Sequence, residues 1–537
     1  MKKDTFEIGL CMAGAVSAGA YTAGVVDYLI EALEEWEKKR GQEGVPTHHV
    51  IIKAIGGASA GGMTGIIAAS ALNNAIEPIK TSDPNDLFKP RPENKLYHSW
   101  VDLSDDDMFP LMLDNADIED GKIYSLLNSN FIDEISKKAM LVDKENWIER
   151  KYVDNNMKFF TTFTNLEGLK YNTKFRGNQI FDDYLISRHN DYGAFVLNTS
   201  QTGYKDDGWI PVDFQNDVNL DLVRHASMAT GAFPVGLRSR KIKRDKSYVN
   251  DHKWHKDITS RNPVSDIPYE ALIVDGGTIN NEPFERVKEL LSGVDKNHEK
   301  CSSTVMMIDP FPSEAEKFDV DDDGLFQVIG ATLSAMLGHL RTKPEVLEEA
   351  LEDDDASQFL VAPRRKINGE WKEGSRAIAC GFLGGFGGFI HKEFRIHDYF
   401  LGRANCERFL REHFTVPIDT SNPIFVDGYK DIPKDQFVSA DGKWRQIIPI
   451  FTPKKNEMYM PDFSGGSNWP VRNEKDVDRF KKLIKKRAGK VIMNMVDYSW
   501  KQRLLLSIGN WVVIKGKLAN AVLGTIKSSM KEHKLLK

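Results

Sequence analysis

Short runs of β-branched and aromatic residues alternate with longer segments of helical periodicity through the first 310 residues of this 537-residue chain. Five of these runs predict strands, at residues 6–12, 49–55, 158–166, 270–275 and 304–309. Between the first two runs, apolar side chains such as Val25, Leu29 and Trp36 recur at helical spacing. The alternation predicts a three-layer α/β fold, in which helices cover both faces of a mostly parallel sheet. Such folds bind their ligands at the carboxyl ends of the strands.

The pattern changes at residues 310–324, which are acidic and contain proline. Beyond them the helical period dominates, so we predict an α/β domain over residues 1–315 and a helix-rich region over residues 316–537. The acidic segment contains DVDDDG, which is similar to the start of a calcium-binding loop. Its twelfth position is Gly330, where that loop needs a bidentate glutamate. An acidic surface turn is therefore the favoured interpretation, and no metal site is predicted.

Composition narrows the function classes. The net charge is −6, whereas duplex-binding proteins are usually basic, so nucleic acid is not an expected partner. None of the four cysteines belongs to a CxxC pair, which disfavours a zinc or redox site and indicates a reducing compartment. The uncharged run at residues 9–26 is rich in glycine and alanine and follows Asp4 and Glu7, unlike a signal peptide. No other stretch is apolar enough for a transmembrane helix, and we expect a cytoplasmic protein.

The stretch AIGGASAGG, residues 54–62, follows the second predicted strand and places one hydroxyl, on Ser59, among glycines and alanines. It matches the G-x-S-x-G pattern with Gly57 and Gly61 on either side of the serine. In this pattern a strand turns sharply into a helix, and small neighbours leave the hydroxyl exposed at the turn. The N-terminal amides of the following helix favour negative charge near it. Ser59 is thus a candidate nucleophile.

A second loop of small residues, MAGAVSAGAYTAG, follows the first predicted strand. The chain has neither the G-x-G-x-x-G spacing nor a GK[ST] motif, which argues against a phosphate-binding loop. Small side chains also let main-chain N–H groups approach a substrate. Gly14, Ala15, Val16 and Ser17 are therefore candidates for an oxyanion hole.

A base for the serine is suggested by ALIVDGGTINNEP, where a strand ends in Asp275 and the pair Gly276-Gly277 follows. A carboxylate at a buried strand end, held by a tight turn, could activate a hydroxyl. Taken alone, the segment also fits a structural turn. A triad with histidine stays open as an alternative, although the candidate histidines lie in no comparable turn. They are His298, His339, His391 and His397.

Taken in order, the small-residue loop, G-x-S-x-G and D-G-G resemble the patatin-like phospholipases. The block HASMATGAFPVGL at residues 225–237 and the NNEP after D-G-G are also similar to that family, and the resemblance spans residues 6–310. One departure stands in the first loop, where Ala18 occupies the position of the family's basic residue. Loss of that residue puts substrate orientation and loop anchoring in question.

The resemblance implies a Ser–Asp dyad, with Ser59 as nucleophile and Asp275 as base, that hydrolyses lipid esters through an acyl-enzyme. Main-chain amides of the first loop would stabilise the oxyanion, and no cofactor or metal would be needed. The expected substrate is a phospholipid, cleaved in the manner of a phospholipase A. Two alternatives stay open: a soluble-ester hydrolase with a histidine triad, and a non-catalytic lipid-binding protein that keeps the fold.

Two features of the second half bear on lipids. Glycine and phenylalanine alternate at the start of residues 380–410, which fits either an apolar wall for an acyl chain or, as we favour, a tight packing loop. Basic amphipathic helices are predicted near residues 476–496 and in the lysine-rich tail. We favour docked helices with solvated basic faces there, and peripheral membrane contact through them stays open.

Overall fold

The computed structural model describes most of the chain, and the described residues are 4–79, 84–103, 107–119, 121–173, 184–197, 207–312, 355–367, 370–452, 459–495 and 510–537. The predicted acidic turn in 310–324 extends into residues outside these ranges, and its DVDDDG lies wholly outside them, as does His339.

A mixed, mostly parallel sheet forms the centre of the molecule, as predicted. All five predicted strands are present, as β1 (Thr5–Met12), β2 (His49–Gly57), β3 (Val153–Thr173), β7 (Tyr269–Asp275) and β8 (Ser303–Ile308). Four further strands join them: β4 (Tyr184–Leu197), β5 (Ile210–Val212), β6 (Arg240–Arg244) and β9 (Gln358–Val361). The order is β5-β4-β3-β2-β1-β8-β9, with β7 beside β3 and β6 beside β7. Five neighbouring pairs are parallel and three, all involving β3 or β7, are antiparallel.

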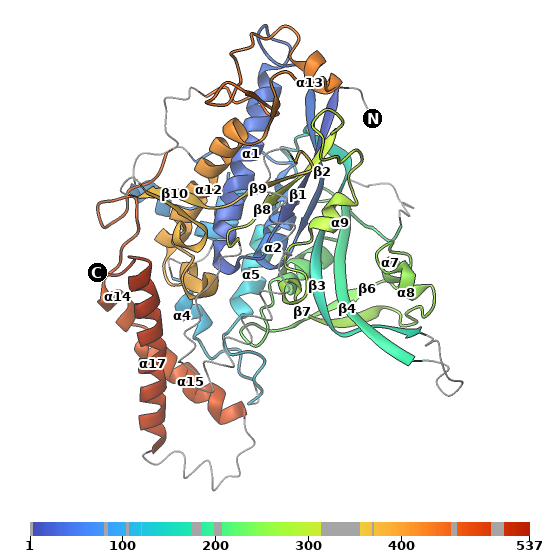
Figure 1. Cartoon of the computed structure of the whole chain (residues 1–537). Helices are drawn as coiled ribbons and strands as arrows, with labels where there is room; N and C mark the ends of the chain where they lie inside the picture. The colour runs from blue at the N-terminus through green and yellow to red at the C-terminus, as the bar shows by residue number, and fades with distance from the viewer. Residues whose placement is uncertain are drawn as a thin grey trace.

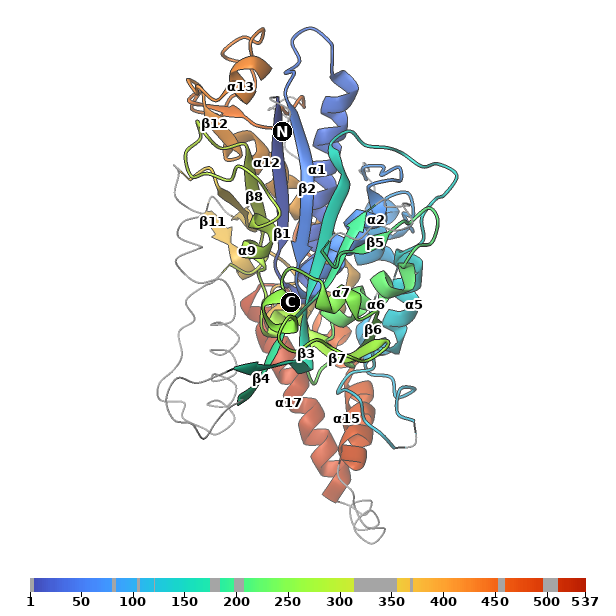
Figure 2. The ribbon, with the colours of Figure 1, turned by 90° about the vertical axis from the view of Figure 1, so that its right-hand side faces the viewer.

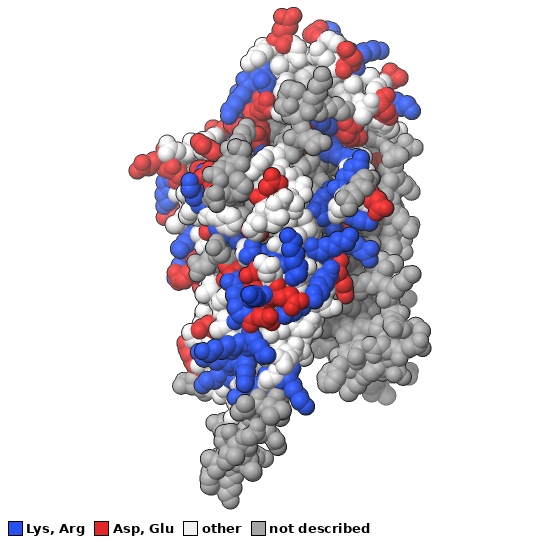
Figure 3. Space-filling view, turned by 90° about the vertical axis from the view of Figure 1, so that its left-hand side faces the viewer, with Lys and Arg blue, Asp and Glu red and all other residues white. Residues whose placement is uncertain are grey.

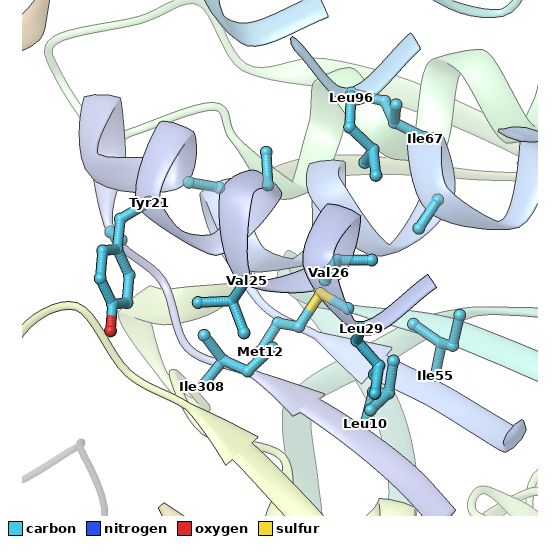
Figure 4. Close-up of a cluster of buried hydrophobic side chains, with 14 of the residues drawn as sticks. Leu10, Met12, Tyr21, Val25, Val26, Leu29, Ile55, Ile67, Leu96 and Ile308 are labelled. Atoms are coloured by element: carbon cyan, nitrogen blue, oxygen red, sulfur yellow. The ribbon is translucent and has the colours of Figure 1, made fainter. Parts of the chain in front are cut away.

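Helices cover both faces of the sheet, so the predicted three-layer arrangement is confirmed (Figure 1). On one face lie α1 (Gly19–Lys39), α2 (Ser59–Ala71) and α12 (Lys392–Glu412), and on the other α8 (Lys256–Thr259) and α9 (Phe284–Lys288). Figure 4 shows Leu10 and Met12 of β1 pointing at Val25 and Leu29 of α1. These side chains belong to a large buried cluster, and removing such apolar surface from water is the main driving force of folding.

Residues after the predicted boundary at 315 pack into the same core. Strand β9 pairs with β8, and α12 lies against α1 so closely that a Cβ on Gly24 would come within 1.9 Å of the Tyr399 carbonyl oxygen. Arg403 of α12 forms buried ion pairs with Asp27 and Glu31 of α1. The division of the chain into two domains at this point stays a prediction.

The C-terminal region is helical, with short hairpins. Its remaining elements are α13 (Pro423–Gly428), α14 (Glu474–Asp478), α15 (Lys481–Met495), α17 (Asn510–Glu532), the hairpin of β10 (Arg364–Ile367) and β11 (Glu370–Glu373), and the hairpin of β12 (Thr415–Pro417) and β13 (Trp444–Gln446). Helices α15 and α17 lie side by side at one end of the molecule (Figures 1 and 2). Among the described residues, no helix combines the length and the apolarity that crossing a bilayer would take.

The register of the sheet brings the ends of the motif-bearing strands to one edge. Met12, the last residue of β1, pairs with Gly57, the last of β2, and Gly57 pairs with Thr161 of β3. Two residues further along β3, Phe163 pairs with Asp275, the last residue of β7. The shorter helices are α3 (Lys95–Tyr97), α4 (Phe109–Met112), α5 (Asn130–Ala139), α6 (Leu220–Thr230) and α7 (Ser247–Asn250), and α6 packs against β7 and α5.

Candidate active site

Ser59 occupies a sharp turn between β2 and α2. Its backbone φ is +50°, a conformation that costs free energy for a residue with a side chain and is found at functional turns. Space at the turn is too small for side chains on the flanking glycines, because a Cβ on Gly57 would lie 2.6 Å from the carbonyl carbon of Gly61. On Gly61 it would lie 2.2 Å from the carbonyl oxygen of Met12. These contacts explain why the sequence is so poor in side chains here.

The turn brings Ser59 into contact with Asp275, 216 residues further along the chain. The Ser59 hydroxyl donates a 2.6 Å hydrogen bond to Oδ2 of Asp275, and the two residues are only 8% and 3% exposed. The other carboxylate oxygen, Oδ1, accepts a 2.7 Å bond from the N–H of Gly277. Gly276 starts the turn and packs against Thr162. The Asp275 side chain is therefore fixed from two sides and aimed at the serine.

Burial raises the pKa of Asp275 from its ordinary value of 3.8 to about 7, although the hydrogen bonds from Ser59 and Gly277 lower it. Loss of solvation disfavours the charged form of a carboxyl group. A base with a pKa near neutrality is well matched to proton transfer at physiological pH. The geometry thus gives Asp275 both the contact and the basicity that activation of a hydroxyl requires.

Threonines that the sequence did not single out position this pair. The Ser59 N–H donates a 3.0 Å bond to the Thr230 hydroxyl, which itself donates to the Thr162 carbonyl. The Thr164 hydroxyl donates to the carbonyl of Asp275. Thr230 ends α6 and belongs to the HASMATGAFPVGL block, so that block was the signal for a residue at the site.

The first small-residue loop lies beside the serine. A Cβ on Gly14 would be 3.0 Å from the Ser59 Cβ, and the Gly14 N–H donates to the Asn281 carbonyl at 3.3 Å. The next residues, Ala15, Val16 and Ser17, turn into α1, with Val16 at a φ of +49°. Within the described part of the chain, their N–H groups have no hydrogen-bond acceptor. They are thus available to a ligand, and Val16 and Ser17 line the same cavity as Ser59.

That cavity, of about 120 Å³, contains both Ser59 and Asp275 and is largely apolar. Its wall includes Met63 and Ile67 of α2, Phe131, Ile132 and Ile135 of α5, Met228 of α6, and Phe386 and Phe389. An apolar pocket with a few converging polar groups is the usual form of a small-molecule site. The arrangement suits a substrate with a hydrocarbon chain next to a reactive polar bond.

The glycine–phenylalanine segment of the second half forms part of this wall, a role that the packing-loop interpretation did not include. It forms a 3-10 turn, Leu383–Phe389, before α12. The Ser17 hydroxyl donates to the Gly385 carbonyl and accepts a 2.9 Å bond from the Gly388 N–H. Packing and lining are therefore combined, because the glycines fit against the first loop while Phe386 and Phe389 face the cavity.

None of the candidate histidines in the described residues lines the cavity. His391 caps the N-terminus of α12, where its ring accepts a bond from the Glu393 N–H, and burial lowers its pKa to about 3. His397 is fully buried and bonded to Asp398, whose oxygens also accept the N–H groups of Ala379 and Cys380. His298 is buried beside Trp444 of the β12–β13 hairpin.

Ala18, which stands where a basic residue was expected, is completely buried at the start of α1. A cation reaches the cavity from another element: Arg395 of α12 is one of the lining residues, and its guanidinium donates a 2.6 Å bond to the Gly388 carbonyl. The first loop is thus anchored through residues 385–395, far along the chain, and this anchoring has no local signal in the sequence.

The fold, the strand-end turn and the small-residue loops agree with a comparison against known families. The model of the patatin-like phospholipase family matches residues 10–288. The chain belongs to this family of lipid acyl hydrolases.

A relative and a solved structure extend the comparison. The uncharacterized protein y4iI of Sinorhizobium fredii (strain NBRC 101917 / NGR234) is 33% identical over 512 residues, which cover 83% of this chain and 70% of that protein. VipD from Legionella pneumophila aligns over 99% of this chain and 85% of its own, with 12% identity and a TM-score of 0.24. That likeness is too weak to bear on fold or function.

Proposed function

We propose that this protein is a serine acyl hydrolase that cleaves phospholipids in the manner of a phospholipase A, with Ser59 and Asp275 as a catalytic dyad. The observation that carries the proposal is the 2.6 Å hydrogen bond between the Ser59 hydroxyl and the Asp275 carboxylate inside an apolar cavity. The acyl-hydrolase activity is assigned to the predicted domain at residues 1–315, and the Gly–Phe segment contributes a wall.

In the first half of the reaction, the ionised Asp275 takes the proton of the Ser59 hydroxyl as the oxygen attacks the ester carbonyl. The oxyanion that forms accepts hydrogen bonds from the N–H groups of the first loop, with Ala15, Val16 and Ser17 as the donors. The tetrahedral intermediate collapses to an acyl-enzyme, and the proton held by Asp275 passes to the departing alcohol oxygen. The lysolipid then leaves.

In the second half, water takes the place of the alcohol. Asp275 accepts a proton from the water as its oxygen attacks the acyl-enzyme, and the same amides bind the second oxyanion. Collapse of this intermediate releases the fatty acid and returns the proton to Ser59. Every proton is handled by the dyad, so the scheme needs no metal or organic cofactor.

The cavity supports a lipid as substrate. Its aromatic and aliphatic wall suits an acyl chain, since burial of each methylene contributes about 0.8 kcal/mol. The four cysteines are all buried and unpaired, which supports action in a reducing compartment such as the cytoplasm.

The test compares Ser59→Ala and Asp275→Asn with the unaltered protein on phospholipid vesicles and on p-nitrophenyl esters. Each substitution is expected to lower kcat by at least about a thousandfold on both substrates, because the members of a catalytic unit depend on one another and the loss of one removes most of the effect of the other. Ser70→Ala is the matched control, because Ser70 lies on the same helix and its hydroxyl donates to the Ile67 carbonyl of that helix. Retention of full activity by either dyad variant would exclude the mechanism. A fluorophosphonate probe that labels the folded protein elsewhere than Ser59 would exclude it as well.

A further inference from the structure

Three exposed apolar side chains stand together beside the outer edge of the cavity. Tyr124, Leu126 and Val235 are 40%, 42% and 72% exposed. Their two loops are joined by main-chain bonds, from the Leu126 N–H to the Val235 carbonyl at 2.9 Å and from the Leu127 N–H to the Gly236 carbonyl at 3.0 Å. Apolar residues that gather on a surface, rather than standing singly, mark interaction sites.

The conformation of Val235 is costly. Its φ is +66°, in the left-handed region that a β-branched residue rarely adopts. The fold therefore holds an apolar side chain out in water at the tip of a strained turn. Strain of this kind is kept where the surrounding structure fixes it, and it points to a function at the tip.

These side chains are continuous with the catalytic cavity. Phe233 and Leu237, on either side of the Val235 turn, line the cavity together with Ser59. The other loop leads through Ser129 into Phe131 of α5, which also line it. A lipid that leaves a membrane at this rim would thus enter the apolar wall without crossing water.

Two cations flank the rim. The Arg238 guanidinium lies 4.1 Å from the ring centre of Tyr124, and the Lys122 ammonium lies 4.9 Å from it. Among the described residues, the ion pairs near this rim are made by Lys137 and Arg240, and none includes Lys122 or Arg238. Cations without a protein counter-charge beside exposed apolar groups complement an anionic, apolar surface.

A basic helix braces the same loop. Arg487 of α15 donates to the carbonyls of Ser125 and Leu126 at 3.0 and 2.8 Å. Helix α15 presents further exposed lysines, among them Lys486 and Lys490. Lysine and arginine side chains also gather in the middle and lower part of the face that Figure 3 shows, and Figures 1 and 2 place α15 at the lower end of the molecule.

We propose that this rim, formed by Lys122, Tyr124, Leu126, Val235 and Arg238, is the surface by which the enzyme docks on a bilayer that contains anionic phospholipids. The apolar side chains enter the interface and the cations contact lipid phosphates, so that the cavity opens toward its substrate. This inference rests on the proposed function, but binding to the bilayer needs no catalysis and is measured separately from it.

The experiment is co-flotation with two kinds of vesicle. One is phosphatidylcholine alone, and the other contains about 30% phosphatidylglycerol, which gives the membrane a negative surface potential. The protein carries Ser59→Ala, so hydrolysis does not change the vesicles. Binding is expected to be stronger with phosphatidylglycerol. Val235→Asp is expected to lower the vesicle partition coefficient by at least about tenfold, because apolar burial is lost. Lys122→Gln is expected to lower the same coefficient about fivefold, because one cation near the anionic surface is lost.

Val426→Asp and Lys430→Gln are the matched controls. Val426 is 49% exposed on α13 and Lys430 follows that helix, at the opposite end of the molecule from α15 (Figure 1). Both should float like the parent. In the background with Ser59 intact, Val235→Asp and Lys122→Gln should hydrolyse a soluble butyrate ester at the parent rate, which also shows that they fold.

The outcomes separate the two ideas. The docking surface would be overturned if the rim variants float like the parent or if the controls lose binding equally. It would also be overturned if the parent floats with neither vesicle, a result that would favour a protein partner. If the Ser59→Ala protein floats as expected while the unaltered enzyme cleaves no ester, the docking surface stands and the proposed hydrolase fails. Leu126→Asp serves as the second rim variant, with the same expected loss of binding.

Discussion

The Ser17 hydroxyl accepts a 2.9 Å hydrogen bond from the Gly388 N–H, across 371 residues of sequence. The same hydroxyl donates to the Gly385 carbonyl, and Ser17 is completely buried. One side chain therefore joins the loop of the proposed oxyanion hole to the segment that carries Phe386 and Phe389. Through this side chain, a segment of the second half of the chain helps to fix the position of the main-chain amides beside Ser59.

The first prediction follows from this link. Ser17→Ala leaves a buried N–H and a buried carbonyl without their partner, so we expect a loss of about 1–3 kcal/mol in the free energy of unfolding. We also expect kcat to fall by about ten- to a hundredfold with little change in KM, because the amides shift relative to the oxyanion. Steady-state kinetics on a soluble ester and urea denaturation measure the two effects. A loss of stability with unchanged kcat would show that Ser17 is structural only.

The pKa of Asp275 predicts the pH dependence of the reaction. The base acts only when ionised, and its pKa is raised to about 7. We therefore expect kcat/KM to rise tenfold per pH unit on the acid side and to level off above a midpoint near pH 7. An organic cosolvent should move the midpoint upward, because ionisation of a carboxyl group creates charge. A midpoint that does not move in cosolvent would instead indicate an imidazolium and argue for a histidine base.

The same shift predicts a cost in stability. The folded pKa of Asp275 is raised from 3.8 to about 7, so the neutral carboxyl stabilises the fold fully below about pH 4, and this stabilisation is lost as the pH rises to 7. At about 1.36 kcal/mol per pKa unit, the loss is roughly 4 kcal/mol. Asp275→Asn has no such titration. The variant should therefore gain stability relative to the unaltered protein between pH 4 and 8, as measured by urea denaturation. A constant difference across this range would contradict the raised pKa.

The sequence allowed much of the fold to be predicted, because strand and helix periodicity are local. All five predicted strands are present, and the G-x-S-x-G context correctly indicated a turn from a strand into a helix. The strand 184–197, β4, was missed because its first half, YLISRHND, places five polar or charged residues in a row after three apolar ones, lacks strand alternation and has no buried residue before Asp191. Strand β9 was missed because four residues carry too little periodicity to be noticed.

The contacts that complete the site had no comparable signal. Asp275 meets Ser59 because β7 runs antiparallel beside β3 rather than within the parallel series, a pairing that no local pattern encodes. Phe386 reaches the cavity because the Ser17 hydroxyl bonds to Gly385 and Gly388 on either side of it. Asp398 fixes the start of the same segment by accepting the N–H groups of Ala379 and Cys380. Pairings between segments hundreds of residues apart depend on how the whole core packs. The assignment of catalytic roles to these residues stays a prediction.

The wall of the cavity predicts a preference for long acyl chains. The Phe386 ring lies 5.6 Å from that of Phe233 and 5.7 Å from that of Phe389, and all three residues line the cavity. Phe386→Ala removes this contact, so we expect kcat/KM for a dodecanoyl ester to fall by about tenfold and for a butyryl ester by much less. A p-nitrophenyl ester series measures the profile. Phe437→Ala, which alters an aromatic contact with Phe451 in the C-terminal region, is the control. An equal loss at every chain length would argue against an acyl-chain wall.

The attachment of α15 predicts a large difference between two arginines. Arg487 and Asp117 are 3% and 7% exposed and form a buried pair with one bond of 2.9 Å. Arg487→Met leaves the carboxylate buried without its counter-charge, which should cost about 3–5 kcal/mol. Arg479, also of the C-terminal region, pairs with Asp107 but is about half exposed, so Arg479→Met should cost no more than about 1 kcal/mol.

Urea denaturation of both variants, followed by circular dichroism, measures this difference. Adding Asp117→Asn to Arg487→Met removes the uncompensated charge and should restore part of the lost stability, because the penalty comes from the buried carboxylate rather than from the missing arginine stem. If the double variant is no more stable than Arg487→Met, the arginine stabilises the loop chiefly through its bonds to the carbonyls of Asp114, Ser125 and Leu126. In that case a substitution that keeps those bonds, Asp117→Asn alone, should cost little.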